Sequence, residues 1–269
     1  MKNFMCVTCG VQYAASDDAP GHCRICDDPR QYVGPDGQQW TTLDALKNGH
    51  SNVFTLLQPG LSSIVTTPRF AISQRAHLVR TPNFNLLWDC ISLIDQSTLV
   101  KIQAMGGLAA IALSHPHYYS TIVDWSRSFG HIPIYVHADD RQWITRPDPV
   151  IRYWEGDSYR LADGLTLVRC GGHFDGASVL HWDDAANNVK RLLVGDTIYV
   201  VSDSRYVSFM YSYPNLIPLP VAKVEQIVQA LAGYDYEQIY DAFGRVILQD
   251  GKAAVLRSAE RYVRAIRGG

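Results

Sequence analysis

Two groups of potential metal ligands stand out in this chain of 269 residues. The first follows the pattern C-x2-C, a gap of thirteen residues and C-x2-C, and consists of Cys6, Cys9, Cys23 and Cys26. Each C-x2-C turn directs two thiolates at one point, and two such turns close a tetrahedral four-thiolate site. The spacing therefore predicts a small zinc ribbon over residues 1–35. Zinc is the more common metal in such a site, with iron as the alternative.

The chain around these cysteines bears on what the ribbon does. We find no secretion signal in the N-terminal residues, which favours a metal site over disulfides or unlinked thiols. Residues 1–35 carry three basic and four acidic side chains. A nucleic-acid-binding module needs a basic face. The ribbon is therefore expected to be structural, or to dock a protein partner, and not to bind nucleic acid.

The second group consists of potential ligands that each stand just past a short apolar segment: His115 and His117 after 108–113, His173 after 165–170, and Asp196 after 191–194. In an extended chain, a His-x-His pair projects both imidazoles to the same side. Three histidines and one carboxylate can hold a metal ion that keeps an open position for water. The pattern therefore predicts a catalytic type of metal site where the ends of these strands meet.

Hydrophobic spacing and turn residues predict the elements that must position these ligands. The expected strands are 62–70, 76–80, 85–88, 108–113, 132–136, two pieces within 159–170, 178–182, 191–194 and 238–240. The expected helices are 41–47, 96–105, 119–129, 138–144, 221–232 and 252–266. Strands come first and then alternate with helices. This order predicts an α/β fold of two sheets packed face to face with helices outside.

Composition excludes several classes of protein. Hydrophobic residues make up 47% and charged residues 19% of the chain, which is typical of a folded protein and not of a disordered one. The formal net charge of −2 indicates no general affinity for nucleic acid. The longest apolar run, 104–113, is far shorter than the roughly 20 residues of a membrane helix. We therefore expect a cytoplasmic protein that acts on a small molecule.

Residues 50–269 resemble the metallo-β-lactamase superfamily, a hydrolase group that includes glyoxalase II, lactonases and nuclease relatives. The matching segments are Leu86-Leu87-Trp88-Asp89, Ser114-His115-Pro116-His117-Tyr118-Tyr119-Ser120, Gly172-His173 and Gly195-Asp196. The resemblance implies an αββα sandwich, preceded here by the four-cysteine ribbon. It also implies that Asp89 supports the metal site without binding the metal.

The chain departs from the family pattern at the second metal position. Tyr119 and Ser120 stand where the family motif has Asp and then His, and 242–245 lacks the family's last histidine. The resemblance therefore implies one metal ion, held by three histidines and Asp196. Neutral imidazoles suit zinc, with iron and manganese as alternatives.

Candidate catalytic groups follow from this site. Asp196 is the first candidate for the base that activates water, and Asp175 is the second. Tyr119 or Tyr118 could donate to a developing oxyanion, or could simply pack. Aromatic residues in 202–218 could line a pocket for a small ester, lactone or thioester.

The alternatives are a non-catalytic binding or regulatory protein, a mononuclear iron oxygenase and a nucleic-acid-processing hydrolase.

Overall fold

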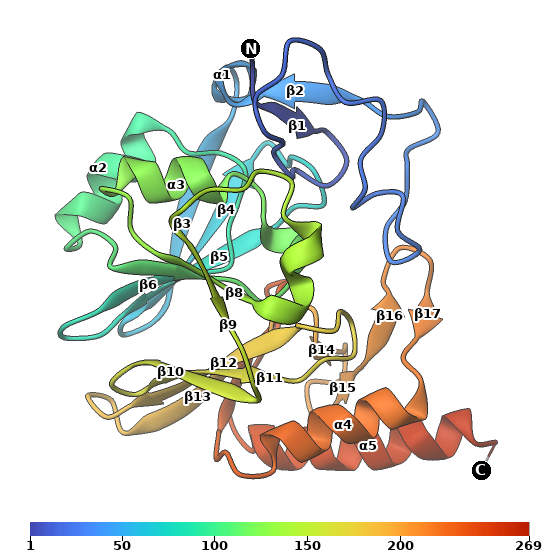
Figure 1. The fold of residues 1–269 in the computed structure, drawn as a ribbon. Coiled ribbons are helices and arrows are strands. Elements are labelled where there is room, and N and C mark those ends of the chain that lie inside the picture. The colour runs from blue at the N-terminus through green and yellow to red at the C-terminus, as the bar shows by residue number, and fades with distance from the viewer. Residues whose placement is uncertain (269) are drawn as a thin grey trace. The chain divides into compact units, whose positions relative to one another are not determined.

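The computed structural model describes residues 1–268, which form two compact units (Figure 1). The first unit comprises Met1–Val136 and Arg141–Tyr153. The second comprises His137–Asp140 and the chain from Trp154 onward. Mixed sheets and helices make up both units, as the sequence predicts for an α/β fold.

A seven-stranded sheet forms the centre of the first unit, with its strands in chain order. Its strands are β3 (Ser51–Gln58), β4 (Leu61–Thr67), β5 (Arg75–Arg80), β6 (Asn85–Trp88), β7 (Ala110–Ala112), β8 (Ile134–His137) and β9 (Ile151–Trp154). The pairs from β3 to β6 are antiparallel, whereas β7 lies parallel to both β6 and β8. Helices α2 (Gln96–Ala104) and α3 (Ile122–Ser128) lie close to one another beside this sheet (Figure 1).

The ribbon belongs to the same unit and shares its core. Strand β1 (Phe4–Cys6) pairs with β2 (Trp40–Thr42), so the polar segment 33–39 returns the chain to the ribbon. Helix α1 (Leu43–Lys47) follows, and the Thr42 side chain caps it by accepting from the Ala45 N–H, as predicted. All four ribbon cysteines pack in one apolar cluster with side chains of the sheet and of α3.

A six-stranded sheet forms the centre of the second unit, in the order β10-β11-β12-β13-β18-β19. These strands are β10 (Ser158–Ala162), β11 (Leu165–Arg169), β12 (Ser178–Asp184), β13 (Val189–Leu193), β18 (Gln238–Tyr240) and β19 (Val246–Ile247). Two small hairpins complete the unit: β14 (Tyr199–Val200) with β15 (Val207–Ser208), and β16 (Met210–Ser212) with β17 (Ile217–Pro218). Helices α4 (Val221–Leu231) and α5 (Gly251–Ile266) run side by side (Figure 1).

Two expected helices and several expected strand positions differ from the structure. The helix expected over 119–129 begins only at Ile122, because a 3-10 turn (Pro116–Tyr118) comes first and Ser120 has a φ of +31°. The helix expected over 138–144 is also a 3-10 helix (Ala138–Trp143). The predicted elements omit β3, β9 and the short strands β1, β2, β14 to β17 and β19. No residue of β3 is fully buried, so burial gives this strand no pattern.

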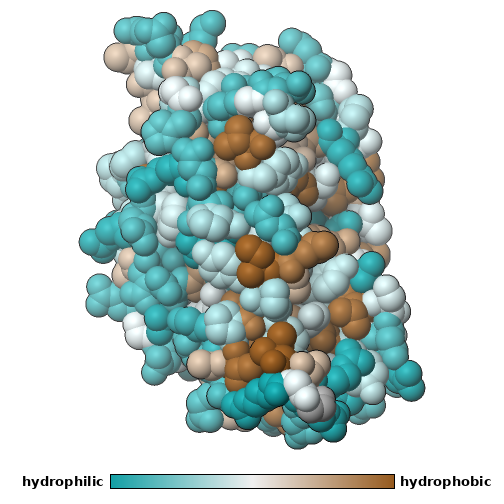
Figure 2. Space-filling model, turned by 90° about the vertical axis from the view of Figure 1, so that its right-hand side faces the viewer, coloured by the Kyte–Doolittle hydropathy of each residue, from teal (hydrophilic) through white to brown (hydrophobic). Residues whose placement is uncertain are grey.

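The helices and the surface have the following features. No helix within residues 1–268 is both long and apolar enough to cross a membrane. Figure 2 shows hydrophobic side chains in small groups separated by hydrophilic ones on the face in view. On α5, the Arg261 guanidinium lies 3.7 Å from the ring centre of Tyr206. The Arg261 side chain of this helix therefore packs on an aromatic ring.

Candidate metal centres

The four-cysteine group has the geometry of a metal site. Its thiols are buried and form no disulfide, and the Sγ atoms of Cys6 and Cys26 lie 3.5 Å apart, those of Cys9 and Cys23 3.6 Å. All four sulfurs lie within 4.8 Å of one another. Zinc–sulfur bonds of about 2.3 Å in a tetrahedron would separate the sulfurs by about 3.8 Å. The four cysteines therefore fit one tetrahedral ion.

Hydrogen bonds around Cys6 favour the thiolate form that a metal requires. The Gln38 side-chain amide donates to its Sγ atom at 3.2 Å, and the backbone N–H of Cys9 donates at 3.5 Å. The thiols of Cys23, Cys26 and Cys9 also lower the pKa of Cys6, whereas burial and contacts within the cluster raise the pKa of Cys9 and Cys26. A negative sulfur in this position is thus stabilised before any metal is considered.

Two further pairs of ligand-type side chains are His115 with His117 in the first unit, and His173 with Asp196 in the second. All four side chains are buried. They are the four residues that the strand-end pattern predicts. Each pair is positioned by its own local structure.

The first pair, His115 and His117, follows β7. His115 is extended, with φ −170°, and His117 lies in the 3-10 turn, so the two ring centres are 4.9 Å apart. The Ser114 hydroxyl lies 2.9 Å from His115 Nδ1. Buried Asp89 accepts a hydrogen bond from the Ser114 N–H at 2.8 Å. Asp89 therefore anchors the start of the ligand turn.

The second pair, His173 and Asp196, follows β11 and β13. His173 Nδ1 lies 3.1 Å from the carbonyl oxygen of Met210, which can only accept a hydrogen bond. This contact places the proton on Nδ1 and the lone pair on Nε2, the tautomer typical of a metal-binding histidine. The Tyr213 hydroxyl donates to the backbone carbonyl of Asp196 at 2.7 Å and so holds the loop that carries this carboxylate.

The other predicted catalytic side chains, Asp175, Tyr119 and Tyr118, have three different environments. The Asp175 side chain is 74% exposed and lies 4.0 Å from Lys223 Nζ, outside the buried metal-ligand set. Tyr119 packs in the apolar core of the first unit, which matches the packing alternative for this residue. Tyr118 contacts the His115 ring edge-on, with ring centres 5.2 Å apart.

The aromatic residues expected in 202–218 include Tyr213, which lies near the second pair, but sequence reasoning missed its neighbours Tyr199 and Phe243. Tyr213 lies 5.8 Å from the His173 ring centre and contacts Phe243 at 4.9 Å. Tyr199 contacts both of these aromatic rings. Phe243 belongs to the segment where the family's last histidine is absent. An aromatic ring therefore occupies this segment.

Asp241 is a buried acid that sequence reasoning also missed. It directly follows β18, as Asp196 follows an apolar strand, and this repeated pattern could have revealed it. Burial raises the pKa of Asp241 to about 6, and the negative charge of Asp196 acts in the same direction. Backbone N–H groups of Val200, Phe243 and Arg245 donate to its carboxylate and partly oppose this shift.

This raised pKa predicts a pH-dependent stability. The unfolded carboxyl ionises near pH 4, whereas the folded one stays protonated until about pH 6, so stability is lost as pH rises through that window. We expect the stability difference between the native chain and Asp241→Asn to change by about 2–3 kcal/mol between pH 4 and 7. Denaturant unfolding at a series of pH values measures it. A difference that stays constant with pH would contradict the prediction.

Comparison with known proteins identifies the fold. No protein-family model matches the chain. The mono-zinc metallo-β-lactamase FIM-1 of Pseudomonas aeruginosa aligns over 78% of this chain and 95% of its own, with a TM-score of 0.57 and 16% identity. A di-iron-bound structure of the protein TTHA1623 aligns over 70% of this chain and 94% of its own, with a TM-score of 0.51 and 20% identity. The chain therefore has the metallo-β-lactamase fold, as the motifs predict.

A much closer sequence relative defines the family. YmaE of Bacillus subtilis strain 168, described as an uncharacterized protein, is 48% identical over 268 residues. The match covers 99% of this chain and 97% of the relative. The chain belongs to the same family as YmaE and has the metallo-β-lactamase fold.

Proposed function

We propose that this chain is a metal-dependent hydrolase that cleaves a small ester, lactone or thioester with a single ion at the histidine site. The observation that carries the proposal is the buried set of three histidines and one aspartate on a chain with the metallo-β-lactamase fold. We propose that all four side chains bind the same ion. The second ion of a dinuclear site would keep only Asp196 as a ligand, since Tyr119 and Ser120 replace the family's Asp and His and 242–245 lacks the family's last histidine.

The donor set fits a borderline metal. Imidazole nitrogens suit zinc, iron or manganese, and the contact from His173 Nδ1 to a carbonyl directs Nε2 toward the metal. We infer zinc at both sites, because four thiolates and a set of three histidines with a carboxylate both favour it.

The protein's own groups have separate roles in the proposed reaction. A bound metal ion would lower the pKa of a water to about 7 and polarise a substrate carbonyl. The carboxylate of Asp196 would accept the proton of the attacking water at one of its oxygens. Tyr213 holds the Asp196 backbone in place through its hydroxyl, so the carboxylate needs little reorganisation.

The substrate class follows from the number of metals and the aromatic cluster. In-line phosphoryl displacement is clamped by two ions about 3.5–4 Å apart, whereas attack on a carbonyl needs one Lewis acid and one activated water. Tyr199, Tyr213 and Phe243 offer aromatic surface near His173. This surface supports an apolar or aromatic ester, lactone or thioester over a phosphodiester.

We expect elemental analysis of protein purified without added metal to find about two equivalents per chain, one in each set of ligands. Cys26→Ser and His117→Ala should each lower the count by one, and removal of both side chains should leave none. A reproducible third equivalent would contradict a mononuclear histidine site.

The activity test uses a chromogenic panel of esters, lactones, thioesters and phosphodiesters with zinc, manganese and ferrous iron. Asp196→Asn should retain metal yet lose at least about 10²-fold in rate, because the amide cannot accept the proton. Asp163→Asn, an exposed aspartate 98% accessible to solvent, is the matched control and should keep the native rate. Asp175→Asn tests the second candidate base.

The outcomes separate the alternatives. Activity confined to phosphodiesters would overturn the substrate class. Oxygen consumption that requires ferrous iron would favour the oxygenase. If metal-loaded protein hydrolyses no substrate of the panel, a binding or regulatory protein would be favoured.

A further inference from the structure

The first cysteine turn of the ribbon docks against buried polar side chains of its own unit. The Ser92 hydroxyl donates to the Gly10 carbonyl at 3.1 Å, and the Gln74 amide donates to the Cys9 carbonyl at 2.6 Å. Gly10 has a φ of +77°, and a Cβ atom there would collide with Ser92 Oγ. The close approach therefore requires glycine and holds the backbone immediately beside a metal-binding sulfur.

Gln74 links this turn to a histidine ligand. The same side-chain nitrogen that contacts Cys9 also donates to the carbonyl of His117 at 3.1 Å. The Gln74 side chain is buried, with only 6% of the residue exposed. One planar amide thus uses both of its N–H groups to join a ligand residue of the four-cysteine site to a ligand residue of the histidine site.

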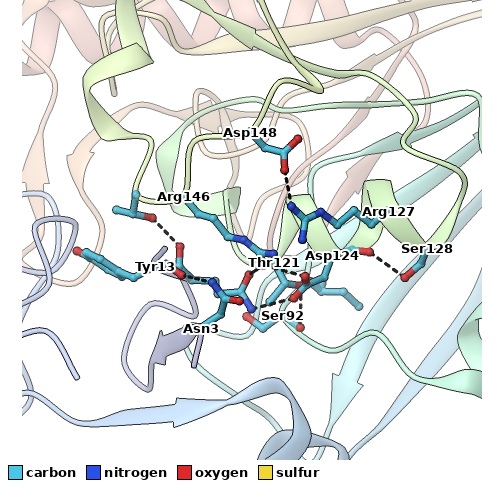
Figure 3. Close-up of polar contacts among 12 residues, drawn as sticks. Asn3, Tyr13, Ser92, Thr121, Asp124, Arg127, Ser128, Arg146 and Asp148 are labelled. Carbon is cyan, nitrogen blue, oxygen red and sulfur yellow. Dashed lines mark hydrogen bonds and ion pairs between the residues drawn. The ribbon is translucent and has the colours of Figure 1, made fainter. Parts of the chain in front are cut away.

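A second contact holds the other end of the ligand turn. The backbone N–H of Gln12 donates to the Ser120 carbonyl at 3.0 Å. The Gln12 side chain donates to Asp124 of α3 at 2.8 Å, and Arg146 forms an ion pair with the same carboxylate. Figure 3 shows Arg146 and Asp124 facing one another near the ribbon residues Asn3 and Tyr13. The ribbon therefore fixes the turn both at His117 and just after it.

We propose that Gln74 is a positioning residue through which metal in the four-cysteine site strengthens metal binding at the histidine site. Metal binding orders a ribbon of this kind, because the site does not exist in the unfolded chain. An ordered ribbon fixes the Cys9 carbonyl, and Gln74 transmits that position to the backbone of His117. The inference rests on the proposed function, since it assumes that His117 binds metal. Linkage requires the coupling to act equally in both directions.

A double-mutant cycle tests this coupling on the full-length protein. Gln74→Glu keeps the shape of the side chain but places an acceptor against two carbonyl oxygens, and Cys26→Ser disables the ribbon site. Chelator competition with Co²⁺ measures affinity at the histidine site, and the thiolate charge-transfer bands report the ribbon separately. Each single variant should weaken the histidine site about 10-fold, and the double variant no further. Gln74→Met removes the amide donor without adding a charge, and it should also weaken metal binding at the histidine site.

Asn85→Asp is the matched control. Asn85 also donates to two backbone carbonyls, those of Met105 at 3.2 Å and Gly107 at 3.0 Å, but it touches neither metal site. The Asn85→Asp variant should keep the metal affinity of the histidine site within about twofold of the native value, because only groups that support a ligand change metal affinity strongly. Circular dichroism confirms that each variant is folded.

The possible failures are distinguishable. Native protein that binds no metal at the histidine site would overturn the proposed function. Native protein that binds metal there, with equal affinity in Gln74→Glu and Asn85→Asp, would overturn only the coupling. Fully additive losses in the double variant would show that Gln74 does not carry the effect of the ribbon.

Discussion

His117→Ala should remove the metal from the histidine site and abolish hydrolysis. The variant leaves three of the four proposed ligands and deletes the ring that stands 4.9 Å from His115. Loss of a single transition-state donor already costs about 10²–10³ in rate, so loss of the ion should cost at least about 10³. Elemental analysis and the ester panel, run on the same preparation, measure both effects.

An exposed histidine provides the control for this experiment. His131 has a φ of +62°, a backbone conformation that asparagine tolerates, so His131→Asn should keep native metal content and activity. Full activity in His117→Ala would refute the assignment of this ligand. Retained metal with lost activity would show that His117 acts in catalysis without being required for metal binding.

Cys26→Ser should empty the ribbon site and destabilise the whole first unit. The ribbon cysteines share one apolar cluster with the seven-stranded sheet and α3, so disorder in the ribbon exposes more than a surface module. We expect a loss of about 3 kcal/mol, which corresponds to a fall in Tm of about 6–12 °C for units of this size. Thermal unfolding followed by circular dichroism measures it, and chelator-treated native protein should approach the same Tm.

Cys90→Ser is the matched control for that loss. Cys90 is buried in the same unit, and its thiol donates to the Ile91 carbonyl at 3.3 Å, a contact that a serine hydroxyl can replace. Its destabilisation should stay near the typical value of about 1 kcal/mol for a single substitution. An equal fall in Tm for both variants would indicate that the metal contributes little to stability.

Local signals in the chain determine the ligands and many of the elements. The cysteine spacing predicts the four-thiolate cluster, because a C-x2-C turn is set by backbone geometry within four residues. The His-x-His pair, His173 and Asp196 are predicted by their places just past apolar strands. The predicted α2 helix also agrees with the structure, beginning at Gln96 and ending just before the Gly106-Gly107 stop. The proposed division into residues 1–35 and 50–269 stays a prediction.

Only the tertiary structure reveals how these ligands are supported. Gln74 contacts Cys9 and His117, which lie 65 and 43 residues away in the chain. Asp241 acquires its raised pKa from burial, and backbone N–H groups of two separate segments only partly oppose that rise. Such contacts leave no regular spacing in the sequence, because the partners of a polar side chain are set only when distant segments pack together. Ligand identity is therefore a local property of this chain, whereas ligand support is decided by the fold.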